Sequence, residues 1–297
     1  MAFQVSPGVQ VKEIDATNVI PAVSTSIGGF AGSFNWGPVD QIVTVGSESE
    51  LAERFGTPDD NTAKYFLTAA AFLKYGNALK VVRAASGHDN ATADGTGQLI
   101  KNSVDYENNY SSGSLSKGLW VAKYPGSLGN SLKVSMISQG IADFTAWAHA
   151  GSFDGAPGTS DYAVNLGKTS YNDELHVAVI DEDGLWTGTA GTVLETFAFV
   201  SQASDAKKTD GTTNYYKDVI NNTSEYIWWA DHDSTNLTNA GESLASRSSA
   251  FDTHNAVIDH SLSGGSDDNT PTVGEIALAY DLFEDAETVD VNLLFAC

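Results

Sequence analysis

The sequence predicts a mixed α/β fold in which a sheet is flanked by helices. Three observations support this prediction: short apolar segments with strand-type alternation, segments with helical spacing and helix-end signals, and the interleaving of the two along the chain. Strands that alternate with helices favour α/β or α+β layers over an all-β or all-helical core. The sequence shows no internal repeat.

The first residues predict an extended strand followed by a linker. Val5, Val9 and Val11 alternate with polar residues, which favours a strand. The Pro-Gly pair at 7–8 interrupts the strand and favours an edge or an extended arm over a central position. Residues 15–21 read as the linker. Such a strand can pair within its own domain or with another molecule.

The remaining elements follow from end signals and periodicity. Ser47 and Glu50 form a capping-box pattern, and the helix that it starts ends before Gly56. Helices are also predicted over residues 62–75, 215–221 and 270–283, the last with Thr270 as N-cap and Pro271 at its first position. Strands are predicted over residues 39–45, 79–84, 132–138, 174–181, 193–200, 226–230 and 289–295. Polar, Gly-rich segments predict a surface excursion at 86–117, which could be a loop or a small hairpin, and loops at 151–159 and 261–269.

The charge excludes two classes of partner. The chain has 38 acidic and 15 basic side chains, a net charge of −23 and a sequence pI near 4.3. Nucleic-acid binding and anionic-lipid binding both need basic clusters, so neither nucleic acid nor direct membrane binding is expected. Residues 1–150 carry a net charge of −3 and residues 151–297 carry −20. This asymmetry indicates either a solvated acidic face or halves that face different neighbours, and we favour the solvated face.

No motif in the sequence marks an active site. The single cysteine, Cys297, allows no intrachain disulfide, and the six histidines show no zinc-site spacing. The sequence has no P-loop, GxGxxG or GxSxG pattern, no segment long and apolar enough to span a membrane, and no signal-peptide pattern at its start. The acidic loops at 231–233 and 267–269 could hold calcium, but solvated loops are the commoner explanation. We therefore expect no enzyme activity, cofactor, catalytic residue or metal ligand.

A set of landmarks resembles, in order, the tail sheath proteins of contractile-tailed phages. They are Ser6-Pro7-Gly8-Val9, Gly28-Gly29-Phe30-Ala31-Gly32, Trp36-Gly37-Pro38, Lys80-Val81-Val82-Arg83-Ala84, Lys123-Tyr124-Pro125-Gly126 with Gly129-Asn130, Leu262-Ser263-Gly264-Gly265, and Tyr280-Asp281-Leu282-Phe283 with Val289–Leu294. Each landmark is weak by itself, but seven of them in the family's order over nearly the whole chain are specific.

The resemblance implies a non-enzymatic structural subunit of the virion tail. It implies a homo-oligomer of sixfold rings that stack as a helical sheath around the tail tube, contact tube and baseplate proteins, and contract to drive the tube through the host envelope for genome ejection. The protein would assemble in the host cytoplasm. The implied assembly arm, which would add a strand to a neighbouring subunit, comprises Val5, Pro7, Gly8, Val9, Val11 and Ile14. The implied family turns are Gly37, Pro38, Pro125, Gly126, Gly129, Asn130, Gly264 and Gly265.

The resemblance also implies a domain plan. Residues 1–22 would be the arm and linker, residues 23–265 a tail-sheath-like α/β domain with the 86–117 excursion, and residues 266–297 the linker helix and first strand of a truncated C-terminal core domain. The apolar end at 293–297 either completes the sheet of the preceding domain or marks a missing partner layer. Two alternatives stay open: the sheath of a phage-like injection particle, and a calcium-dependent binding module or glycan-active enzyme.

Overall fold

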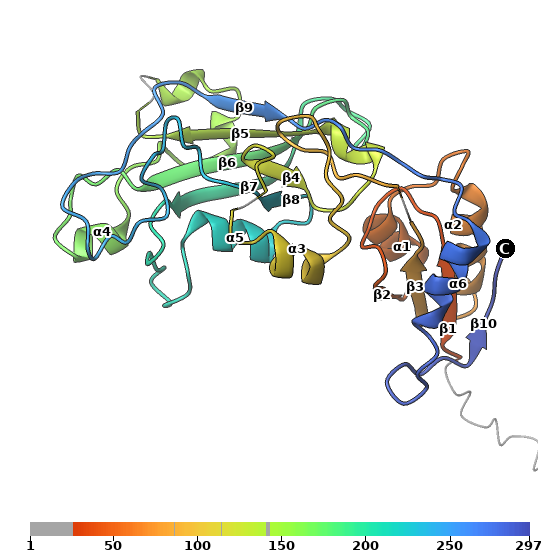
Figure 1. The fold of residues 1–297 in the computed structure, drawn as a ribbon. Coiled ribbons are helices and arrows are strands. Elements are labelled where there is room, and N and C mark those ends of the chain that lie inside the picture. Colours follow the sequence, from red (N-terminus) through yellow and green to blue (C-terminus); the bar gives the residue numbers. More distant parts are fainter. Residues whose placement is uncertain (1–25, 86, 114, 141–142) are drawn as a thin grey trace, which may run out of the picture.

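The structure is a computed structural model that describes residues 26–85, 87–113, 115–140 and 143–297. These residues form two lobes that lie side by side (Figure 1). We call residues 26–85 with 267–297 the small lobe, and residues 87–266 the large lobe. Both lobes combine sheets with helices, so the predicted mixed α/β class is confirmed. Within the described ranges no helix is long and apolar enough to cross a membrane.

The small lobe is a four-stranded sheet with helices on both faces. Its strand order is β10-β1-β3-β2, with β1 parallel to β10 and β3, and β2 antiparallel to β3. The elements are β1 (Gly28–Gly32), β2 (Ile42–Val45), α1 (Glu48–Phe55), α2 (Ala63–Leu73), β3 (Leu79–Arg83), α6 (Val273–Asp281) and β10 (Leu293–Leu294). The capped helix after Ser47 and the helix predicted at 62–75 are both confirmed, as α1 and α2.

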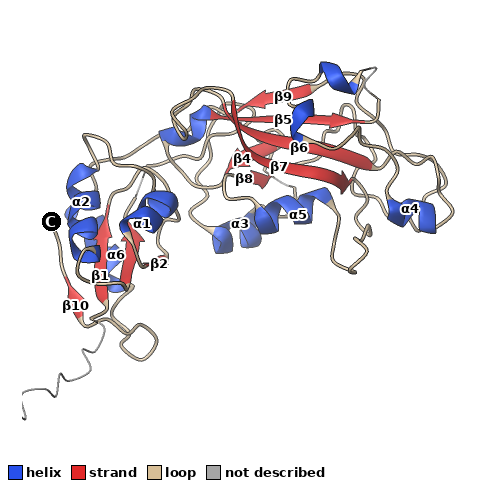
Figure 2. Ribbon diagram, turned by 180° about the vertical axis from the view of Figure 1, so that it is seen from behind, coloured by secondary structure: helices blue, strands red, loops and turns tan. Residues whose placement is uncertain are grey.

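Alternation along the strands gives each face its own helices. Phe30 and Val81 pack in one cluster with residues of α1 and α2, whereas Ala31 and Val82 pack in another with residues of α6. Successive side chains of a strand point to opposite faces, so α1 and α2 cover one face and α6 covers the other. Figure 2, seen from behind Figure 1, shows the same separation.

The last residues of the chain return to the first strand. Gly28 and Gly29 of β1 pair with Leu293 and Leu294 of β10, and Phe295 stacks on Phe30 with ring centroids 5.2 Å apart. The C-terminal segment therefore adds an edge strand to the sheet of the preceding chain. Of the strand predicted over 289–295, only Leu293–Leu294 is regular. The sequence predicts a domain boundary between residues 265 and 266. Strand β1, which precedes that boundary, and strand β10, which follows it, pair in the same sheet.

The N-cap of α6 is Thr272, so the predicted N-cap at Thr270 is wrong. The Thr272 side chain accepts a hydrogen bond from the Glu275 amide at 3.3 Å, and the Glu275 carboxylate accepts one from the Thr272 amide at 2.7 Å. This reciprocal pair satisfies two free amides, which Thr270 and Pro271 cannot do two residues earlier.

Replacing Thr272 by alanine should therefore cost more stability than the same change at Thr270. We expect Thr272→Ala to lower the free energy of unfolding by about 1 kcal/mol, because the first turn loses its cap. Thr270→Ala is the matched control, with an expected change below about 0.5 kcal/mol. Urea unfolding followed by far-UV circular dichroism measures both. Equal losses for the two variants would contradict this assignment of the cap.

The large lobe contains a four-stranded antiparallel sheet and a two-stranded ribbon. The sheet order is β7-β6-β5-β9, and β4 pairs with β8. The elements are α3 (Ser103–Asn109), β4 (Trp120–Ala122), η2 (Ser127–Ser131), β5 (Leu132–Ser138), η3 (Phe144–Ala146), η4 (Ala150–Ser152), α4 (Asp161–Asn165), β6 (Glu174–Asp181), β7 (Thr192–Ser201), α5 (Tyr216–Thr223), β8 (Ile227–Trp229) and β9 (Ile258–Ser261). The strands predicted at 132–138, 174–181, 193–200 and 226–230 and the helix at 215–221 are confirmed. Strand β9 and helices α3 and α4 were not predicted.

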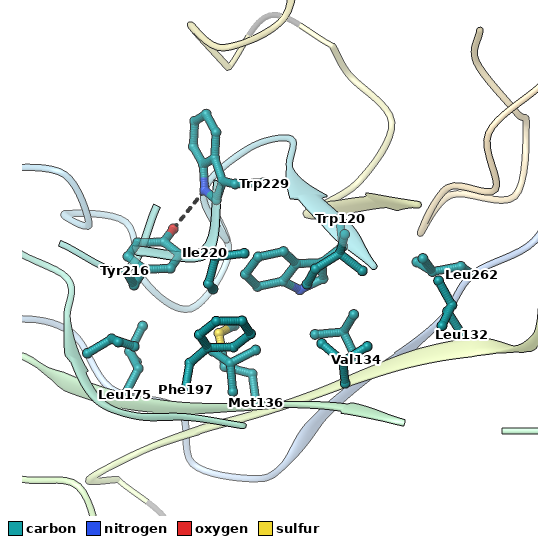
Figure 3. Packing of buried hydrophobic residues seen from close by; sticks show 14 of the residues in the cluster. Trp120, Leu132, Val134, Met136, Leu175, Phe197, Tyr216, Ile220, Trp229 and Leu262 are labelled. Carbon is teal, nitrogen blue, oxygen red and sulfur yellow. Dashed lines mark hydrogen bonds between the residues drawn. The ribbon is translucent and has the colours of Figure 1, made fainter. Parts of the chain in front are cut away.

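The core of the large lobe lies between the sheet and the ribbon. Figure 3 shows Trp120 and Trp229 from the ribbon above Met136 and Phe197 from the sheet. Trp229 donates a hydrogen bond to the Tyr216 hydroxyl at 3.1 Å, so the polar edge of the indole is satisfied inside the core.

The segment at 86–117 is only in part the surface excursion that its composition predicts. It contains helix α3, and Ile100, Tyr106 and Leu115 from it are buried together with Trp228. Tyr106 stacks on Trp228 with ring centroids 4.3 Å apart and donates a hydrogen bond to the Trp229 carbonyl at 2.5 Å. Three well-separated apolar residues therefore anchor a segment that is otherwise polar.

A half-buried carboxyl at the start of β6 gives the large lobe a specific pH dependence. Burial raises the pKa of Glu174 to about 7, although its carboxylate accepts a hydrogen bond from the Gly158 amide at 2.8 Å, which acts in the opposite direction. A carboxyl whose pKa is higher in the folded state binds its proton more tightly there. Its contribution to stability is therefore present below the ordinary pKa near 4.5 and is lost as the pH rises to about 7.

Replacing Glu174 by glutamine should remove this pH dependence. Glutamine can still accept the Gly158 hydrogen bond but carries no charge to desolvate. We expect the variant to gain about 1–2 kcal/mol over the wild type between pH 4.5 and pH 8, after discounting for partial solvent screening. Urea unfolding at several pH values measures the difference. Parallel pH profiles for the two proteins would contradict this account.

Candidate functional site

The predicted family turns meet where the two lobes join, around one buried arginine. Arg83 ends strand β3 of the small lobe and is fully buried. Its Nη1 donates hydrogen bonds to the Gly37 carbonyl at 2.9 Å and to the Pro125 carbonyl at 2.7 Å. Gly37 belongs to the small lobe and Pro125 to the large lobe, so a single guanidinium nitrogen is hydrogen-bonded to both lobes.

The guanidinium keeps its charge in this buried position. Burial lowers the pKa of Arg83 to about 10, and the nearby carboxylate of Asp267 acts in the opposite direction. The side chain is therefore protonated at neutral pH. Nε and Nη2 are buried and make no hydrogen bond with the residues that the structure describes. A buried charge with incomplete hydrogen bonding is costly, and the two carbonyl contacts, one in each lobe, offset part of that cost.

Gly126 allows the backbone of the large lobe to approach this arginine. Its φ is +140°, and a Cβ atom there would lie 2.8 Å from the Asn35 carbonyl oxygen and 3.0 Å from Oδ1 of Asp267. The next residue, Ser127, donates its amide hydrogen to Oδ1 of Asp267 at 3.0 Å and its hydroxyl hydrogen to Oδ2. Only glycine fits both the backbone conformation and the available space.

The remaining turn residues connect neighbouring loops by hydrogen bonds and close packing. The side chain of Asn130 donates to the Gly265 carbonyl at 3.0 Å and accepts from the Gly265 amide at 2.8 Å. Gly264 has a φ of +80°, and Gly129 lies against Ala122, which a Cβ atom on Gly129 would approach to 2.9 Å. The structure thus brings together the turns at 37–38, 125–130 and 264–265, which the sequence only marked one by one.

Further contacts cross the junction near Pro38. The Val39 amide donates to the Lys101 carbonyl at 2.8 Å, and the Asn102 side chain donates to the Val39 carbonyl at 2.9 Å. Lys101 Nζ lies 2.7 Å from a carboxylate oxygen of Asp40. Sequence reasoning missed these residues and the role of Arg83. The only available signal was an arginine directly after Val81 and Val82 at the end of a strand.

A crevice of about 380 Å³ lies between the lobes on the side of α1. Trp36, Ile42 and Arg54 line it from the small lobe, and Tyr124 and Glu225 line it from the large lobe. Trp36 meets Tyr124 edge to face at 5.4 Å, and Arg54 forms an exposed ion pair with Glu225 at 3.5 Å. The junction therefore combines a buried charge with aromatic packing, and exposed ion pairs lie at its edge.

The predicted arm lies outside the described residues. Its members are Val5, Pro7, Gly8, Val9, Val11 and Ile14. The acidic loops considered for calcium are hydrogen-bonded to protein groups. Asp233 accepts from Thr235, Asn236 and His254, and Asp267 accepts from Ser127. Among the described residues no group of three or more potential ligands is placed to hold a metal ion.

Comparison with known proteins confirms the resemblance. Residues 25–84 match the family model described as tail sheath protein Gp18 domain III, N-terminal region. The chain is 34% identical over 196 residues to the tail sheath protein of Salmonella phage ViI, covering 65% of this chain and 28% of that protein. It is 42% identical to the tail sheath protein of Enterobacteria phage T4 and 44% to that of Vibrio phage KVP40. Both of these matches extend over 101 residues, which is 34% of this chain and 15% and 14% of those proteins.

These matches relate the chain to structural proteins of the bacteriophage virion. More particularly, it is a sequence relative of phage tail sheath proteins, and the matched segments span between 14% and 28% of the length of the relatives named here. The matched family segment ends at residue 84, where the chain leaves β3 for the large lobe.

Two solved structures also resemble the fold. The sheath tail protein of Listeria innocua matches with a TM-score of 0.44 and 12% identity, over 91% of this chain and 40% of that one. The sheath tail protein of Desulfitobacterium hafniense matches with a TM-score of 0.43 and 11% identity, over 97% of this chain and 45% of that one.

Proposed function

We propose that the chain is a structural, non-enzymatic subunit of a contractile tail sheath. In this proposal copies of the subunit form sixfold rings that stack around the tail tube, contact baseplate proteins, and contract to drive the tube through the host envelope. Assembly takes place in the host cytoplasm and the product resides in the virion tail. The observation that carries the proposal is the match of residues 25–84 to a tail sheath domain.

The junction between the lobes supports movement of the subunit as one body. Contraction of a lattice by rearrangement of rigid subunits requires that the lobes of each subunit keep their relative positions. Arg83 is buried and donates hydrogen bonds to both lobes. Backbone hydrogen bonds at Val39 and the Lys101–Asp40 ion pair form a second set of contacts between the lobes. The connections between subunits would then come from the proposed arm and linker, residues 1–22. Their Val5–Ile14 strand would add to the sheet of a neighbouring subunit by main-chain pairing.

Immunogold electron microscopy of intact phage tests the proposal. An antibody raised against residues 143–266 of the large lobe should label the tail along its length in both extended and contracted particles. Label spacing that shortens on contraction would show that the labelled subunit moves with the sheath. Labelling of the capsid or the tail fibres alone, with a bare tail, would refute the proposal.

A further inference from the structure

Helix α2 presents a basic and apolar stripe to solvent. Lys64, Leu67, Ala71, Lys74 and Tyr75 are exposed, at the spacing of one helix face. Leu67 is 59% exposed and Tyr75 is 96% exposed. Two exposed acids, Asp59 and Asp60, precede the helix, and the Asp59 carboxylate accepts a hydrogen bond from the amide of Thr62. We call these five exposed residues the α2 stripe.

Helix α6 presents an acidic and apolar stripe. Val273 is 88% exposed and Leu278 is 67% exposed, and Ala277, Asp281 and Asp285 are exposed beside them. Residues 267–297 contain eight acidic and no basic side chains: Asp267, Asp268, Glu275, Asp281, Glu284, Asp285, Glu287 and Asp290. The C-terminal end of a helix is also the negative end of its dipole, which adds to the negative potential near Asp281. We call these five exposed residues the α6 stripe.

The two stripes lie on opposite faces of the same sheet. Leu79 and Phe30 pack with α2 on one face, and Ala31 and Val82 pack with α6 on the other. Figures 1 and 2 show the two helices on opposite sides of the strands. One copy therefore cannot bring its own two stripes together, but two copies placed head to tail can.

We propose that the α2 stripe of one copy docks on the α6 stripe of the next copy of this chain. Charge complementarity selects this pairing: α2 against α2 would oppose lysines, and α6 against α6 would oppose carboxylates. Exposed leucine, valine and tyrosine side chains would be buried in the contact. Because the two faces differ, the contact is heterologous and repeats without closing on a pair. That the occupant is a second copy rests on the proposed sheath function.

Engineered cysteines test the contact directly in the full-length gene product. Every protein carries Cys297→Ser, and any cysteine outside residues 1–297 is likewise replaced by serine, so the only thiols are the introduced ones. A protein with both Ala71→Cys and Ala277→Cys should give a ladder of disulfide-linked oligomers on a non-reducing gel after mild oxidation. Mixing the two single variants should give dimers only. Ala71→Cys combined with Ala190→Cys, which places the second thiol on the large lobe, is the control and should give no ladder.

Charge reversal provides a second readout. Lys64→Glu with Lys74→Glu should lower the ladder yield about tenfold or more, and adding Asp281→Lys with Asp285→Lys should restore it. A yield no higher than that of the control, or dimers from Ala71→Cys alone, would overturn the proposal. If the protein formed tubular sheaths but gave no ladder, this contact would be refuted and the proposed sheath function would still hold. If the protein gave the ladder but were absent from the phage tail, the contact would be supported and the sheath function would be refuted.

Discussion

Replacing Arg83 by methionine is expected to lower the free energy of unfolding by about 3 kcal/mol. The variant keeps the length of the side chain but leaves the Gly37 and Pro125 carbonyls buried without a donor, and each costs about 1–3 kcal/mol. Part of the loss is offset because no charge has to be buried. Urea unfolding monitored by tryptophan fluorescence measures the change, since Trp36 lies at the junction.

Two further variants test whether the lost hydrogen bonds of Arg83 cause the loss of stability. Arg83→Lys retains the charge and a donor, so it should lose less stability than Arg83→Met. Arg54→Met is the matched control, because Arg54 forms only an exposed ion pair with Glu225 across the same junction. We expect a change within about 0.5 kcal/mol for the control. If Arg83→Met behaved like Arg54→Met, the buried arginine would not hold the lobes together.

The secondary structure followed closely from local patterns. The predicted strand over 174–181 corresponds to Glu174–Asp181, and the predicted helix over 62–75 corresponds to Ala63–Leu73. Apolar periodicity and end signals are local properties, so one sequence is enough to detect them. Strand β9 was not predicted, because Ile258–Ser261 contains two ionisable residues and only one apolar residue, the isoleucine, and so lacks an apolar alternation. It is a strand because it pairs with β5, which is a long-range event.

The junction depended on information that a single sequence does not contain. Glycine and proline marked the turns at 37–38, 125–126 and 264–265, because turn chemistry is local. The convergence of the first two turns on Arg83 depends on contacts between residues more than 40 positions apart. The return of Leu293–Leu294 to β1 is longer still, since 265 positions separate the paired residues Gly28 and Leu293. Apolar patterning predicts which face of an element is buried, but not which distant segment covers it.

Replacing Gly126 by alanine is the second change with a large expected effect, about 2–4 kcal/mol of lost stability. Two costs add. A φ of +140° is strained for alanine, and the new methyl group would lie 2.8 Å from the Asn35 carbonyl oxygen. The backbone must then move away from Arg83, which weakens the hydrogen bond to the neighbouring Pro125 carbonyl.

Gly151→Ala separates this effect from a general cost of replacing glycine. Gly151 also lies in the large lobe, but no atom lies within 4 Å of where its Cβ would be, and its φ is not positive. We expect this control to be neutral within about 0.5 kcal/mol or slightly stabilising, since alanine restricts the unfolded chain. Urea unfolding compares the two. Because Gly126 and Arg83 act on the same carbonyl, Gly126→Ala and Arg83→Met together should cost less than the sum of the single changes, whereas Gly151→Ala and Arg83→Met should be additive. Strict additivity of the first pair would mean that Gly126 does not act through the arginine that joins the lobes.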